Sequence, residues 1–203
     1  MRSIAHVAAA LALIGASAAA LAQTPRPGIV RGAIVSIDGA NMAVKTRAGE
    51  TINLHLTNPQ RIDAVIPAQL SDIKPGVFVG AAAMPGADGT LTAMEVHIFP
   101  ETARGTGEGF RPFDLAPGST MTNANISAMI DSVAGPKLTL TYKGGEQTVV
   151  VDKQTPIVTF APGDASDLKP GASVDIFGSS QTPDGVYEAK RIVVGRNGTK
   201  VPM

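Results

Sequence analysis

The hexapeptide Ser71-Asp72-Ile73-Lys74-Pro75-Gly76 occurs twice in this chain with one conservative change. It returns 95 positions later as Ser166-Asp167-Leu168-Lys169-Pro170-Gly171. An Asp-Gly pair follows each copy, at Asp88-Gly89 and at Asp184-Gly185, with an offset of 96 positions. Blocks that recur in the same order at a nearly constant offset indicate an internal repeat.

The repeat sets the domain boundaries that we expect. Residues 29–99 and residues 125–195 form the two copies, and residues 100–124 belong to neither copy. Residues 196–203 are a short tail. We therefore expect two small domains of the same fold, joined by a connector.

Alternating apolar and polar residues predict strands within each copy. Ile52, Leu54 and Leu56 alternate with polar neighbours, which is the period of a half-buried strand. Residues 58–76 lack this pattern and are predicted to be irregular. The predicted strands are 29–37, 42–47, 52–57, 77–84 and 91–99 in the first copy, and 138–142, 148–151, 174–177 and 186–194 in the second.

Five strands with an interruption between the third and the fourth have the order of an OB-type barrel. Pro75 and Gly76 re-aim the chain into the fourth strand, because proline extends its predecessor and glycine allows a left-handed turn. Barrel closure also removes exposed strand edges. We expect an all-β chain of two tandem five-stranded OB-like barrels, and an open sandwich of short strands is the alternative.

The N-terminus has the pattern of a secretory signal, which we assign to residues 1–22. Arg2 supplies the positive charge, residues 4–21 are mostly apolar, and Ala20-Leu21-Ala22 is a small-x-small cleavage signature. A retained membrane anchor is the alternative, but the stretch is short and rich in alanine. We expect cleavage after Ala22 and a periplasmic or secreted protein without stable membrane insertion.

The composition narrows the classes of partner and cofactor. The chain has 17 Lys and Arg against 17 Asp and Glu, so its formal net charge is zero. This balance gives no attraction to nucleic acid or to an anionic membrane. The chain has no cysteine, which excludes disulfides and zinc–thiolate sites. We expect an unknown protein or small ligand as the partner, and no nucleic acid.

The connector contains more than a flexible linker needs. Its glycine-rich centre also includes large apolar and charged side chains. Gly105, Gly107 and Gly109 lack the spacing and the strand–helix surroundings of a phosphate-binding loop. We expect an ordered connector packed between the barrels, with a ligand or partner site at Arg104, Glu108, Phe110, Arg111, Phe113 and Asp114.

The chain resembles a family of uncharacterised exported bacterial small-barrel domains, which is a domain of unknown function. The repeated Asp-Ile/Leu-Lys-Pro-Gly motif and the following Asp-Gly carry part of this resemblance. The connector segments 104–109, 112–114 and 119–123 carry the more specific part, since they are similar to the segment between the barrels of two-copy members. The resemblance covers residues 29–195. It implies the fold and the compartment, and it supplies no catalytic residue.

Two histidines remain after the predicted signal, His55 and His97. Each lies between apolar residues of a predicted strand, so both side chains should point away from the apolar face. The third and fifth strands are neighbours in an OB-type barrel, which could bring both imidazoles and Glu95 together. Two histidines and a carboxylate suit a divalent or copper ion. Two solvated surface histidines are the alternative interpretation.

These observations lead to two hypotheses. The first is a non-enzymatic exported binding or accessory protein, which needs no cofactor and has its site where the connector meets the barrels. The second is a periplasmic metal-handling protein that uses His55 and His97. We expect no enzyme, because the sequence contains no recognisable constellation of nucleophile, acid and base.

Overall fold

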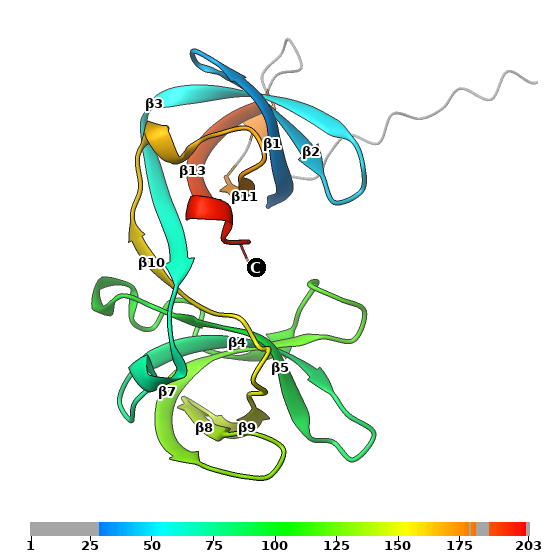
Figure 1. The fold of residues 1–203 in the computed structure, drawn as a ribbon, viewed down its shortest axis with the longest axis vertical. Coiled ribbons are helices and arrows are strands. Elements are labelled where there is room, and N and C mark those ends of the chain that lie inside the picture. Colours follow the sequence, from blue (N-terminus) through cyan, green and yellow to red (C-terminus); the bar gives the residue numbers. More distant parts are fainter. Residues whose placement is uncertain (1–28, 179, 182–186, 202–203) are drawn as a thin grey trace, which may run out of the picture.

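The computed structural model describes residues 29–178, 180–181 and 187–201 (Figure 1). The predicted signal and the Asp184-Gly185 turn lie outside these residues. The regular structure in the described part is strand with short 3-10 turns, which confirms the all-β prediction. None of the helical turns described is long and apolar enough to cross a membrane. The strands are β1 (Val30–Asp38), β2 (Asn41–Thr46), β3 (Thr51–Pro67), β4 (Phe78–Pro85), β5 (Leu91–Ile98), β6 (Gly109–Pro112), β7 (Thr120–Ile130), β8 (Lys137–Tyr142), β9 (Gly145–Val150), β10 (Ile157–Pro162), β11 (Ser173–Phe177), β12 (Ser180–Gln181) and β13 (Tyr187–Gly195), and the 3-10 turns are η1 (Leu70–Asp72), η2 (Glu101–Ala103), η3 (Ala165–Asp167) and η4 (Arg196–Gly198).

Five strands close into a barrel, which we call barrel A. Its order is β1–β2–β3–β13–β11, and β11 pairs back to β1. Neighbouring strands are antiparallel except β3 and β13, which are parallel. Closure leaves no open edge on this ring, which excludes the open sandwich for these strands. The core of barrel A consists of Ile34, Met42, Val44, Leu54, Leu168, Val174, Ile176, Tyr187, Ala189, Ile192 and Val194.

Strands β4, β5, β9, β8 and β7 form a second circuit of pairings, which we call ring B. A short parallel pairing closes it, in which Leu91 and Thr92 of β5 face Val149 and Val150 of β9. Figure 1 shows barrel A in the upper half of the molecule and ring B in the lower half. The core of ring B consists of Ile73, Val79, Ala81, Ala83, Leu91, Ala93, Val96, Ala124, Ile126, Leu138, Leu140, Val149 and Val151.

Each of the two circuits contains strands from both copies of the sequence repeat. Barrel A combines β1, β2 and β3 of the first copy with β11 and β13 of the second copy. Ring B combines β7, β8 and β9 of the second copy with β4 and β5 of the first copy. We expected residues 29–99 and residues 125–195 each to close a barrel alone, and the pairing differs from this expectation. The last two strands of each copy are exchanged between the copies.

The repeated Lys-Pro-Gly turn takes part in this exchange. Gly76 and Gly171 have φ angles of 88° and 87°, in the left-handed region that glycine tolerates. The Gly76 amide donates to the Ile126 carbonyl of β7, and the Gly171 amide donates to the Ile34 carbonyl of β1, both at 2.8 Å. Each turn therefore docks on the first strand of the other copy.

The length of β3 accounts for the exchange. We predicted irregular chain from residue 58, but β3 continues without a break to Pro67. Its second half pairs with β10 on one edge and with β13 on the other. These partners satisfy the backbone hydrogen-bonding groups that the irregular prediction left open. Figure 1 shows β3 and β10 running together from barrel A to ring B, so the chain reaches ring B before it forms β4.

Candidate functional site

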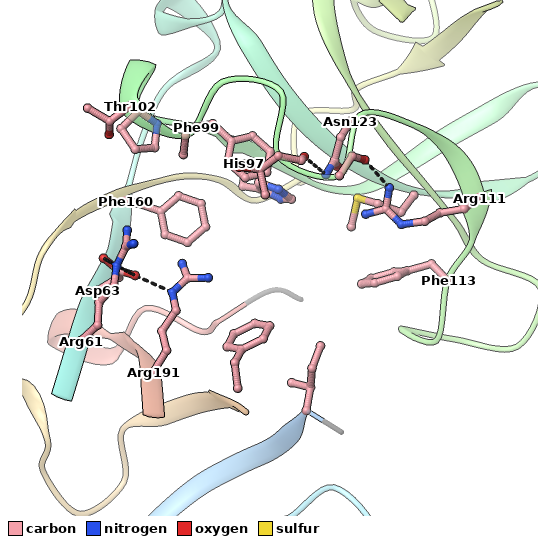
Figure 2. A pocket seen from close by; sticks show the side chains of 17 residues that line it. Arg61, Asp63, His97, Phe99, Thr102, Arg111, Phe113, Asn123, Phe160 and Arg191 are labelled. Atoms are coloured by element: carbon pink, nitrogen blue, oxygen red, sulfur yellow. Dashed lines mark hydrogen bonds and ion pairs between the residues drawn. The ribbon is translucent and has the colours of Figure 1, made fainter. Parts of the chain in front are cut away.

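A cavity of about 340 Å³ lies where barrel A, ring B and the connector meet. Figure 2 shows the side chains that surround it. Its wall includes three arginines, one aspartate, one histidine and four phenylalanines. The volume falls in the range of small-molecule sites, and such sites often lie between domains.

His97 and Glu95 form a buried pair on β5. His97 Nδ1 lies 3.1 Å from Glu95 Oε1, and the two residues are only 1% and 2% exposed. A carboxylate accepts, so we assign the proton of this contact to Nδ1. The pair fixes the orientation of the imidazole at the cavity wall.

The absence of a side chain at Gly80 leaves room for the side chains of His97 and Asn123. Gly80 lies on β4 between β5 and β7, opposite His97 on one side and Asn123 on the other. A Cβ on Gly80 would lie 2.1 Å from His97 Nε2 and 2.7 Å from Asn123 Oδ1. The Asn123 side-chain amide donates to the Thr106 carbonyl of the connector at 2.9 Å. Within the described residues, His97 Nε2 and Asn123 Oδ1 are buried and have no hydrogen-bond partner.

Aromatic rings surround the imidazole. Phe99 and Phe160 approach His97 edge-on, with ring centroids 4.6 Å and 5.8 Å away. The same two phenylalanines stack on one another at 5.9 Å. Below them, the guanidinium of Arg191 lies 5.1 Å from the centroid of Phe177. The cavity therefore offers flat apolar faces beside positive charge.

Three arginines line the cavity from two sides. Arg61 of β3 and Arg191 of β13 both donate through Nε to Asp63, at 3.1 Å and 2.7 Å, which leaves their terminal nitrogens free of bonds in the described part. Arg111 of β6 donates to the Gly107 carbonyl at 2.7 Å. Figure 2 shows Arg61 and Arg191 on one side of the hollow and Arg111 on the other. One carboxylate, that of Asp63, and three guanidinium groups are among the side chains that line the cavity.

Two of the predicted connector residues hold the connector against ring B. Arg104 donates to the Gly76 carbonyl at 2.9 Å and also to the Asn125 side chain of β7. Glu108 accepts from the Lys143 amide at 2.9 Å. Strand β6 adds a backbone pairing with β7. The connector is therefore an ordered part of ring B, and these two side chains position it without lining the cavity.

The other predicted connector residues divide between the cavity and its surroundings. Arg111 and Phe113 line the cavity. Asp114 accepts from Arg31 of β1 at 2.7 Å, which ties the connector to barrel A. Phe110 is 43% exposed and does not line the cavity.

Arg31 also faces a buried carboxylate. Its Nε lies 3.3 Å from Asp175 Oδ2 of β11. Burial raises the pKa of Asp175 to about 7, against the opposing attraction of Arg31 and Arg47. The guanidinium of Arg31 lies 5.7 Å from the ring centroid of Phe113. One arginine thus joins the connector, β1 and β11 beside the cavity.

His55 lies apart from His97 and Glu95. It is exposed on β3, with Nδ1 3.3 Å from the side-chain oxygen of Asn41. There β3 pairs with β2 and β13, whereas β5 belongs to ring B. The strand exchange separates the third and fifth strands of one copy, so His55 does not join the predicted metal ligands. No cluster of three or more potential metal ligands was found among the described residues.

Arg61, Asp63, Phe160 and Arg191 are among the cavity residues that the sequence pattern did not indicate. Arg61 and Asp63 belong to the part of β3 that we predicted to be irregular. They alternate with Ile62 and Ala64, and this period of two was a usable strand signal. Phe160 and Arg191 belong to the second copy, and only the strand exchange brings them to this place.

The comparisons with known proteins give one partial match. Residues 127–193 match a family described as "Domain of unknown function (DUF5666)". The matched segment begins in β7 and ends in β13, so its strands lie in both ring B and barrel A. No curated protein and no solved structure matches the chain. The chain is thus similar to that family over these residues, and the match assigns no activity to the cavity.

Proposed function

We propose that this chain is a non-enzymatic exported binding protein whose ligand occupies the cavity between barrel A, ring B and the connector. One observation carries the proposal. Three parts of the chain converge on a hollow of about 340 Å³, and three arginines and four phenylalanines line it. A hollow of this size, with apolar rings and a few polar groups in its wall, has the properties of a small-molecule site.

The architecture supports a site held between two barrels. When each strand is numbered by its place within its own sequence copy, both circuits have the first–second–third–fifth–fourth order of an OB barrel. We interpret them as two OB-like barrels with exchanged strands. The exchange makes β3 and β10 continuous bridges beside the cavity. A rigid wall of this kind lowers the entropic cost of binding. Export of the protein rests on the sequence pattern of residues 1–22.

Metal handling is a second candidate function. The contact of His97 Nδ1 with Glu95 favours it, since a histidine that ligates a metal usually donates its other nitrogen to a carboxylate. The exposed position of His55 does not favour it. Titration of the metal-free protein with zinc and copper in a calorimeter tests this candidate. Heat that is absent, or unchanged in His97→Ala, contradicts it.

Native mass spectrometry of protein recovered from its own host tests the binding function. We expect an additional bound mass on the wild-type chain that is lost in Thr102→Trp, because Thr102 lines the cavity and a large ring there would alter its wall. Thr92→Trp is the matched control, since Thr92 is exposed on β5 and does not line the cavity. A bound mass that Thr102→Trp retains would place the ligand elsewhere and contradict the proposal.

A further inference from the structure

We infer that the cavity takes a small organic anion with a flat apolar body, such as an aromatic carboxylate or phosphate ester. This inference rests on the proposed binding function and names the chemical class of the ligand. It follows from two properties of the wall that lie side by side, an excess of guanidinium groups and a set of phenyl faces.

The arginines are arranged to receive an anion. Arg61 and Arg191 each bond Asp63 through Nε. Their terminal nitrogens bond no other group in the described part of the chain, so they are available to an oxygen of the ligand. Arg111 uses one terminal nitrogen on the Gly107 carbonyl and keeps the other. A guanidinium binds carboxylate or phosphate oxygens in pairs, which gives both energy and orientation. A neutral ligand would not make these charge-assisted hydrogen bonds.

The phenyl groups of the wall favour a ligand whose uncharged part is flat and apolar. Phe99 and Phe160 stack at 5.9 Å beside His97. Phe177 packs against the same core cluster as Phe160, and Phe113 of the connector also lines the cavity. Aromatic faces of this kind pack against flat apolar groups. An inorganic anion would contact the arginines and leave the phenyl surface in water.

The position of the arginines also predicts what binding does to the protein. Arg191 belongs to barrel A and Arg111 to the connector on ring B, on opposite sides of the hollow in Figure 2. An anion that contacts both sides joins barrel A to the connector. Ligand binding should therefore raise the melting temperature of the whole chain.

Calorimetry and thermal shift with four probes test the inference on the full-length mature protein. We expect benzoate or phenyl phosphate to bind with a Kd on the order of 1 mM or tighter, as suits molecules of this size. The two probes distinguish a carboxylate from a phosphate. Benzamide has the shape of benzoate without its charge, and acetate has the charge without the ring, so both should bind at least about tenfold more weakly.

Substitutions then locate the anion. Arg111→Gln and Arg191→Gln should each weaken the binding of the better probe by about tenfold, because each removes a charge-assisted hydrogen bond. Arg111→Lys should bind more weakly than the wild type, since lysine lacks the planar fork. Lys153→Gln is the control, because Lys153 is exposed and does not line the cavity. The melting temperature of each free variant checks folding, and Arg111 and Arg191 test opposite sides independently.

Three results would overturn the inference. Benzamide that binds as tightly as benzoate would show an apolar site without anion selectivity, and the proposed binding function would stand. Benzoate binding that survives both glutamine substitutions would place the anion outside this cavity. If neither charged probe binds up to about 10 mM, the anion class is wrong, and the search for a native bound mass still decides the binding function separately.

Discussion

At the scale of single residues, Gly80 determines whether the cavity wall can form. A side chain at this position would collide with His97 Nε2 and with Asn123 Oδ1. We expect Gly80→Ala to lower the free energy of unfolding by about 1–3 kcal/mol, because the new methyl group would lie 2.1 Å from a buried nitrogen. Denaturant unfolding measures this loss.

Gly86→Ala is the matched control for that substitution. The nearest atom to its new methyl group would be a carboxylate oxygen of the exposed Asp88, at 3.0 Å, and that side chain can move. A loss of stability in Gly86→Ala, in the turn after β4, as large as in Gly80→Ala would mean that the effect is not specific to the cavity wall.

Asp175 gives the protein a specific dependence on pH. Its pKa near 7 in the folded state lies above the ordinary value of 3.8, so the folded chain retains this proton longer than the unfolded chain. The contribution of Asp175 to the free energy of unfolding is therefore largest at low pH, and it falls as the pH rises from about 4 to about 8. Asparagine resembles the protonated acid. We expect Asp175→Asn to gain stability relative to the wild type over that interval, by a few kcal/mol.

The comparison is made by chemical unfolding at a series of pH values. Asp114→Asn serves as the control, because Asp114 also pairs with Arg31 but its side chain is 67% exposed. A stability difference between Asp175→Asn and the wild type that does not change with pH would show that Asp175 is ionised throughout. The charged groups that act on Asp175 are Arg31, Arg47 and Glu95, so the measurement reports on this cluster.

At the scale of elements, the connector is ordered by a few side-chain bonds. Arg104 reaches the turn before β4 and the side chain of Asn125 on β7. We expect Arg104→Ala to lower the free energy of unfolding and to make the connector sensitive to protease, since the bonds of a charged donor are lost. Limited proteolysis with mass spectrometry locates the cleavage. Lys74→Ala, an exposed neighbour of the same turn, should leave the connector protected.

The sequence predicts most of the strands and fewer of their partners. Strict alternation located the start of β3, and turn residues located the hairpins, because both signals are local. The exchange between the copies was not predictable in the same way. Two similar copies offer similar pairing partners, and the choice between them depends on the path of the chain after Leu56. The cavity residues of β10 and β13 were missed for that reason, whereas Arg111 and Phe113 lie in the connector and were found.

At the scale of the whole molecule, the strand exchange decides which fragments can fold. The strands of ring B all lie within residues 78–150, together with the connector. We expect a fragment of residues 68–156 to fold alone, with a β-type circular dichroism spectrum and cooperative unfolding. A fragment of residues 125–195 contains three strands of ring B and two of barrel A. It should form a dimer that repeats the exchange, which analytical ultracentrifugation can measure.

A stable monomer of residues 125–195 would show that one copy can close its own barrel and that the exchange depends on the tethered pair. A disordered fragment of residues 68–156 would show that ring B needs β10 or barrel A as support.

The same arrangement has a consequence for the newly made chain. Synthesis delivers β1, β2 and β3 first, yet the strands that close their barrel end only at Gly195. Ring B is complete earlier, once Val150 has emerged. During this interval the outer edges of β1 and β3 are unpaired, and unpaired edges are the usual starting points of aggregation. The chain is thus most prone to aggregation after β1, β2 and β3 have formed and before β11 and β13 are available to close their barrel.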